Sequence, residues 1–66
     1  MNNLKEIRSK RGFSQSQLSK HSNVSIRTIQ KYEQGSLDIN KANGETLYKL
    51  ATALDCRMED LLQLDA

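Results

Sequence analysis

The sequence contains no proline and no tryptophan, only one cysteine and three glycines, and no long hydrophobic run. One cysteine cannot form an internal disulfide, and one cysteine with one histidine cannot provide the four ligands of a structural zinc site. No apolar stretch approaches the roughly 18 residues that cross a bilayer. We therefore expect a cytoplasmic protein without a disulfide, a metal site or a membrane association.

The chain is also short, with 66 residues, which predicts a single domain over residues 1–66. A chain of this size buries about 60% of its unfolded surface, so its small core leaves little room for a catalytic cleft. No nucleophile, base and oxyanion donor can be grouped in this sequence. We expect neither an enzyme nor a bound cofactor.

The net charge of +2 conceals a division along the chain. Residues 1–34 carry seven Lys and Arg against two Glu, a net charge of +5, whereas residues 35–66 carry three Lys and Arg against six acidic residues, a net charge of −3. This division indicates one surface suited to a polyanion and another turned away from it. A solvated surface of mixed charge is the alternative that charge alone leaves open.

Apolar residues recur at helical spacing along most of the chain, and no stretch alternates for long enough to form a strand. The pattern predicts an all-α fold of five short helices. The clearest apolar stripe lies in the fourth, where Leu47, Leu50, Ala51 and Leu54 share one face. The helices are expected at about 3–11, from Ser14 onward, from Ser25 to Gly35, at about 44–54 and at about 57–64.

Local signals mark where the second and third helices begin. Ser14 and Gln17 have the spacing of a capping box, and Ser25 is a favourable N-cap for the following helix. Residues 20–24 between the two helices are too few for anything but a tight turn, in which Asn23 tolerates a left-handed backbone. Two short helices joined so closely predict a helix-turn-helix.

The segment 35–43 has no clear period and is expected to form a loop, with Leu37 and Ile39 packed against the body of the domain. Apolar residues of this loop and of the last helix are candidates for a dimer interface, although core positions fit the pattern equally well. The candidates are Ile39, Met58, Leu62 and Leu64.

The third helix has an outward face of polar side chains. When Ile29 points inward, Arg27, Thr28 and Lys31 lie together on the opposite side, because residues three and four apart are helical neighbours. Arg and Lys can donate to guanine, and Thr can bond to several bases or touch a thymine methyl group. The face suits the major groove of DNA, although ordinary surface residues would show the same pattern.

The start of the second helix offers free backbone N–H groups and the positive end of the helix dipole. Gln15 and its neighbours are therefore expected to form a seat for a phosphate. Lys10 and Arg11 lie nearby in the chain and are expected to add diffuse attraction for a polyanion.

Four motifs together are specific: SQxxL at 14–18, VS at 24–25, IxxxExG at 29–35 and LxxLAxAL at 47–54. With them, the run FSQSQLSKHSNVSIRTIQKYEQG resembles the helix-turn-helix of the Xre family, which includes the lambda and Cro phage repressors. The resemblance covers about nine tenths of the chain. It implies a five-helix, lambda-repressor-like DNA-binding domain whose helix-turn-helix is formed by the second and third helices.

The resemblance also implies roles for single residues. The start of the third helix is expected to face base edges through Ile26, Arg27 and Thr28, with Lys31 one turn later. Arg8 is expected to pair with Glu33 and to connect the first and third helices. The residues expected at the DNA backbone are Ser14, Gln15, Ser25, Gln34 and Ser36.

These features predict a sequence-specific regulator of transcription, of bacterial or phage type, that binds double-stranded DNA and acts as a repressor. One such module makes few contacts, so a homodimer on a palindrome with half-sites about 10 base pairs apart is expected. The alternative is a protein-interaction module, such as an antitoxin-like partner that binds another protein through its acidic C-terminal half.

Overall fold

The computed structural model describes residues 3–63, which form four α-helices and two short 3-10 helices. In chain order these are α1 (Asn3–Lys10), α2 (Gln15–Ser22), α3 (Ile26–Gln34), η1 (Ile39–Lys41), α4 (Gly44–Leu54) and η2 (Met58–Leu61). Residues 3–63 contain no strand, in agreement with the predicted all-α class. None of the helices in this range combines the length and the apolar character that a membrane span requires.

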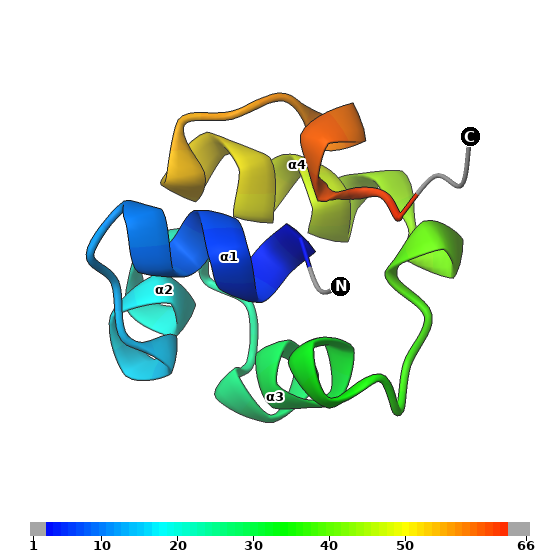
Figure 1. Ribbon diagram of the computed structural model, residues 1–66, viewed down its shortest axis with the longest axis horizontal. Coiled ribbons are helices and arrows are strands. Elements are labelled where there is room, and N and C mark those ends of the chain that lie inside the picture. Colours follow the sequence, from blue (N-terminus) through cyan, green and yellow to red (C-terminus); the bar gives the residue numbers. More distant parts are fainter. Residues whose placement is uncertain (1–2, 64–66) are drawn as a thin grey trace.

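The helices surround one apolar core, with α1 between α3 on one side and α4 on the other (Figure 1). Helix α2 packs against both α3 and α4. Each α-helix and η2 supplies at least one of the largest fully buried side chains. These are Leu4, Leu18, Ile29, Leu50, Leu54 and Leu61. Because Ile29 is held in this core, the opposite face of α3 is turned away from it.

The helices begin at the caps that the sequence indicates. The Ser14 hydroxyl accepts from the Gln17 backbone N–H at 3.1 Å, and the Gln17 side chain accepts from the Ser14 N–H at 2.8 Å. The predicted capping box is confirmed. The Ser25 hydroxyl accepts from the Arg27 N–H at 3.2 Å and caps α3.

The turn between α2 and α3 is shorter than expected. The last residue of helix α2 is Ser22, and Asn23 caps the helix with a left-handed backbone of φ 63°. Only residues 23–25 therefore connect the two helices. The buried Ser22 hydroxyl accepts from the Val24 N–H at 3.2 Å, and the Ser19 hydroxyl donates to the Val24 carbonyl at 2.6 Å. These bonds fix the turn and therefore the angle between α2 and α3.

The loop that follows α3 differs in part from the prediction. Ile39 opens η1 and is buried, as expected, but the Leu37 side chain is 42% exposed. The Asp38 carboxylate accepts from the Asn40 N–H at 3.0 Å and begins this single turn of 3-10 helix.

The expected fifth α-helix is a single turn of 3-10 helix over Met58–Leu61, so the described residues hold four α-helices and not five. Arg57 stands at the N-cap position of this turn, and its guanidinium has no acceptor for a capping hydrogen bond. The backbone of Leu62, directly after the turn, is already extended. The Asn3 side chain donates to the Leu62 carbonyl at 2.7 Å. The Asn40 side chain accepts from the Gln63 N–H at 2.7 Å and donates to the Gln63 carbonyl at 2.9 Å.

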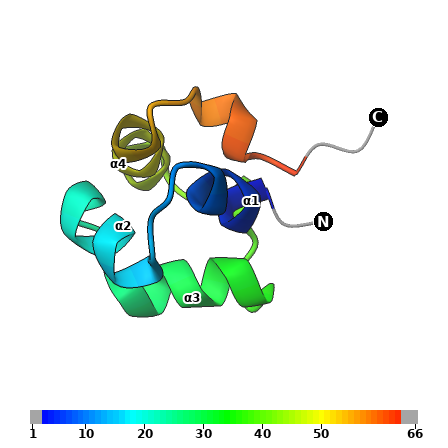
Figure 2. The ribbon, with the colours of Figure 1, turned by 60° about the vertical axis from the view of Figure 1, so that its left-hand side comes forward.

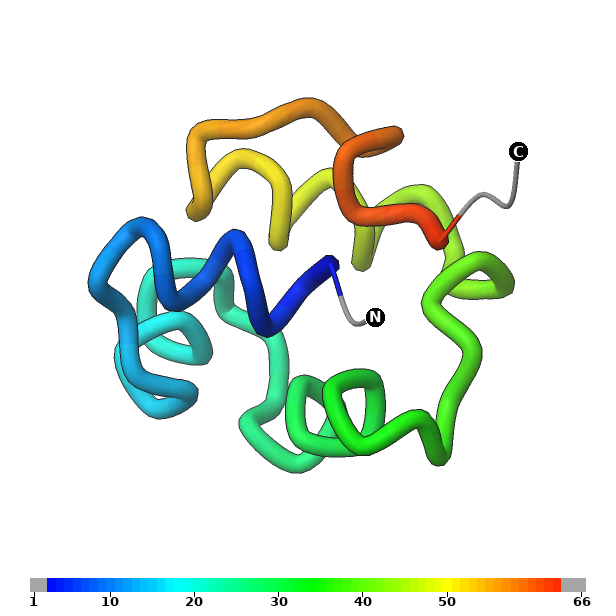
Figure 3. Tube along the Cα trace, in the orientation of Figure 1, coloured from blue at the N-terminus to red at the C-terminus, as the bar shows by residue number. Residues whose placement is uncertain are grey.

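These bonds hold the backbone at 62–63 extended beside η1. The Cα trace in Figure 3 shows the end of the described chain next to the η1 turn. A backbone held in this way cannot continue a helix. The last part of the predicted helix, including Leu64, lies outside the described residues.

Candidate nucleic-acid interface

Helix α3 lies at one edge of the molecule, with α1 and α2 on its inner side (Figure 2). No other element of residues 3–63 crosses its outer side. The Arg27 and Lys31 side chains on this side are exposed, and Ile26 at the start of the helix is 37% exposed. Thr28 is half-buried and lies at the margin of this face, so its side chain is less exposed than the sequence pattern suggested.

The side chains expected at the DNA backbone lie at the ends of the two helices. Ser14, Ser25, Gln34 and Ser36 are exposed, whereas Gln15 is half-buried. The Ser14 and Ser25 hydroxyl oxygens accept capping bonds, which leaves each hydroxyl hydrogen able to donate to a phosphate oxygen. The backbone N–H groups in the first turn of α2 add the positive end of a helix dipole.

The charge of this face is of one sign. Residues 14–37 contain a single acidic residue, Glu33, and its side chain is only 4% exposed and paired with Arg8. Lys20, Arg27 and Lys31 are exposed, and no ion pair within residues 3–63 involves any of them. The α2 and α3 side therefore presents cations without an exposed carboxylate to oppose a polyanion.

The Arg8 and Glu33 side chains form a two-bonded ion pair in the interior. Arg8 Nε donates to Glu33 Oε2 at 2.6 Å, and Arg8 Nη2 donates to Glu33 Oε1 at 3.0 Å. Arg8 Nη1 also donates to the Phe13 carbonyl at 2.7 Å. Because the exposed fractions are 12% for Arg8 and 4% for Glu33, the pair connects α1, α3 and the start of α2 away from water.

Gln15 extends this network towards the surface. Its Nε2 donates to Glu33 Oε1 at 3.0 Å, and its Oε1 accepts from Gln30 Nε2 at 3.4 Å. Sequence reasoning missed Gln30. Its position three residues after Arg27 and four after Ile26, both candidate base-contacting residues, could have placed it on the same side of α3.

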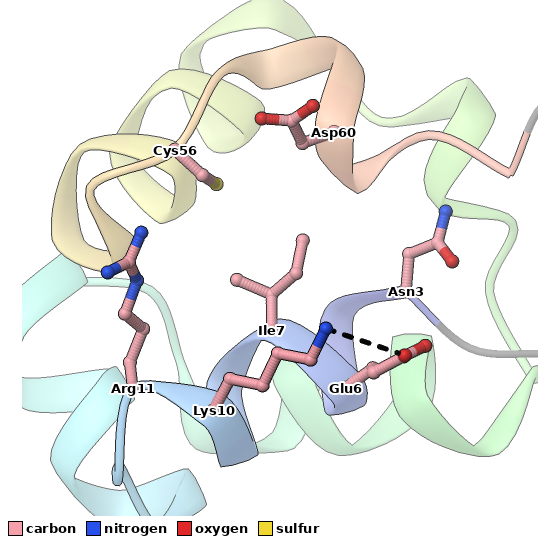
Figure 4. A pocket seen from close by; sticks show the side chains of 7 residues that line it. All are labelled: Asn3, Glu6, Ile7, Lys10, Arg11, Cys56 and Asp60. Carbon is pink, nitrogen blue, oxygen red and sulfur yellow. Dashed lines mark ion pairs between the residues drawn. The ribbon is translucent and has the colours of Figure 1, made fainter.

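Lys10 and Arg11, which were expected to add diffuse attraction for a polyanion near the start of α2, make contacts within α1 and with the end of α4. Arg11 Nη2 donates to the Asp55 carbonyl at 3.0 Å, at the end of α4, and Lys10 Nζ lies 3.9 Å from Glu6 Oε1. Figure 4 shows Arg11 turned towards the end of α4 beside Cys56. The carbonyls exposed at a helix C-terminus attract a guanidinium, which explains this orientation.

Lys10 and Arg11 line an open groove of about 550 Å³ between α1 and η2. Cys56 lies in its wall, and burial, followed by the charge of Asp60, raises the pKa of the thiol. Because the charged form is the one disfavoured, the thiol stays protonated at neutral pH and is a poor nucleophile. Among residues 3–63, no three His, Cys, Asp or Glu side chains gather in a way that could hold a metal ion.

Of the candidate dimer residues that the structure describes, one is buried and two are half-buried. Ile39 is 3% exposed and belongs to the core, which is the alternative that the sequence left open for these residues. Met58 and Leu62 are half-buried and pack against the core, and Leu64 lies outside the described residues. The large apolar side chains that are exposed within residues 3–63 are Ile26, Leu37 and Tyr48.

A capped α2, a three-residue turn and an exposed α3 define a protein of the helix-turn-helix class. The family model described as helix-turn-helix matches residues 4–61. The chain belongs to this family of Xre and lambda-repressor-like domains, which are regulators of transcription that bind DNA and are not typically enzymes. No curated protein and no solved structure matches the chain significantly.

Proposed function

We propose that this protein is a sequence-specific repressor that reads the major groove of double-stranded DNA with α3. Arg27 and Lys31 bond to base edges, while Ile26 meets a thymine methyl group and Thr28 contacts a base from the margin of the face. Each of these side chains is of a type that can distinguish base pairs in the major groove. Repression follows from occupancy, because a bound operator is closed to other proteins.

The main support for this proposal is the charge of the outer face of α3, which has exposed cationic side chains and no exposed carboxylate. Arg27 and Lys31 have no ion-pair partner within residues 3–63, and the one acidic residue of the region is neutralised in the interior. An unpaired Arg can direct its parallel donors at guanine without first breaking a protein contact.

The second helix is proposed to fix the position of α3 by contacting the DNA backbone. Its first turn supplies free N–H groups, the Ser14 hydroxyl and the Gln15 amide, and Ser25, Gln34 and Ser36 supply further polar groups at the two ends of α3. Phosphate contacts set register and orientation, whereas base contacts set specificity. A single domain provides few of either, so we propose that two copies bind a palindrome.

Selection of bound duplexes from a random DNA pool tests this function. We expect enrichment of two inverted copies of one short sequence with centres about 10 base pairs apart. At least one G is expected in each copy, opposite Arg27 or Lys31. Recovery of sequences no more alike than those of the starting pool, although protein is bound, would contradict specific recognition and leave only attraction to phosphates.

A further inference from the structure

A row of polar side chains runs from the interior to the surface of α3. It starts at the buried pair of Arg8 with Glu33, continues through Gln15 at the start of α2, and ends at Gln30. Gln30 is half-buried. By helical geometry it lies on the border of the exposed face nearest α2, one turn after Ile26 and Arg27.

The buried charge determines how both amides are oriented. A carboxylate only accepts hydrogen bonds, so Gln15 must direct its Nε2 at Glu33, as the 3.0 Å contact shows. The Gln15 Oε1 then faces Gln30, and because this oxygen also only accepts, Gln30 must direct its own Nε2 at it. The outer end of Gln30 keeps its Oε1 acceptor and one N–H donor for another molecule.

We propose that Gln30 is a further specificity-determining residue that reads adenine, an inference that rests on the proposed function. In the major groove adenine presents a donor at N6 beside an acceptor at N7. The free oxygen and the remaining N–H of Gln30 complement this pair, whereas guanine presents two acceptors there. Gln15 acts as a positioning residue, since it fixes the amide plane of Gln30 without touching the base.

The test measures Kd for the selected duplex and for duplexes in which each base pair of the half-site is replaced in turn. We expect the wild type to prefer adenine at one position by roughly tenfold or more. Gln30→Met, which keeps the size of the side chain and removes its amide, is expected to lose this preference at that position alone.

Gln15→Met is expected to weaken the same preference, because Gln30 is then free to rotate, and to add a uniform loss on all duplexes from its phosphate contact. The double variant Gln15→Met/Gln30→Met is expected to have the same adenine preference at that position as Gln30→Met alone, since the effects of substitutions in one interacting unit are not additive. A purely structural role of Gln15 would reduce binding to all duplexes equally and would leave the adenine preference unchanged, which contradicts the positioning role.

Gln34→Met is the matched control on the same helix, and a uniform loss across all duplexes is expected for a residue at a phosphate. Gln30→Ala is a second variant that removes the same amide by shortening the side chain, and it is expected to lose the adenine preference in the same way. If Gln30→Met is too unstable to measure, Gln30→Ala decides the question alone.

Two failures are distinguishable. A wild type that binds every duplex equally overturns the proposed function and this inference with it. A wild type that selects a sequence, but whose profile superimposes on those of Gln30→Met and Gln30→Ala, overturns only the role of Gln30.

Discussion

Glu33→Ala is expected to lower the free energy of unfolding by about 3 kcal/mol, because it leaves the Arg8 guanidinium buried without its counter-charge. For a domain of this size the corresponding fall in melting temperature is roughly 15 °C. The substitution also removes the carboxylate to which Gln15 donates at 3.0 Å, so the Gln15 Nε2 loses this acceptor. Thermal unfolding followed by circular dichroism, without DNA, measures the effect.

Glu45→Ala is the matched control for this prediction. Glu45 pairs with Lys49 at 3.1 Å on α4, but the Glu45 side chain is 76% exposed and the pair is screened by water. We expect a loss of at most about 0.5 kcal/mol. Equal melting temperatures for Glu33→Ala and wild type would mean that the buried pair does not stabilise the packing of α1 on α3.

The double variant Arg27→Ala/Lys31→Ala is expected to lose recognition of the selected duplex while remaining folded. Each lost base contact is worth about 1 to 3 kcal/mol, so the Kd for this duplex should rise roughly a hundredfold or more. The Kd for a scrambled duplex should rise much less, since only diffuse attraction is weakened. Fluorescence anisotropy with the two labelled duplexes measures both values.

The control variant Lys49→Ala/Arg57→Ala also removes one Lys and one Arg, but from the side formed by α4 and η2. If α3 is the reading surface, this control should change the Kd for the selected duplex by only about threefold or less. Equal losses in the two double variants would show that total charge, and not the face of α3, governs binding. If the chain is instead an antitoxin-like module, the protein that it binds through its acidic C-terminal half should still bind the Arg27→Ala/Lys31→Ala variant.

The helix boundaries that could be predicted are those determined by neighbouring residues. Ser14 with Gln17 and Ser25 act within one turn, so the starts of α2 and α3 follow from the local sequence. The last segment could not be predicted in the same way. It is held extended by Asn3 and Asn40, which are distant in the sequence, and these tertiary bonds override its helical pattern.

The same distinction applies to the candidate site. The outward position of Arg27 and Lys31 follows from helical spacing and the burial of Ile29. The orientation of Arg11 does not, because its acceptor at the end of α4 is 44 residues away in the sequence. The amide contact of Gln30 was also hidden, since it depends on the angle at which the 23–25 turn sets α3 against α2.

The surface that meets DNA can be mapped directly by titrating ¹⁵N-labelled protein with the selected duplex and following the backbone amide signals of the protein. We expect the largest changes in the first turn of α2 and along α3 to Ser36, with little change in α4 and η2. Changes concentrated on α4 and η2, with α3 unaffected, would contradict recognition by α3.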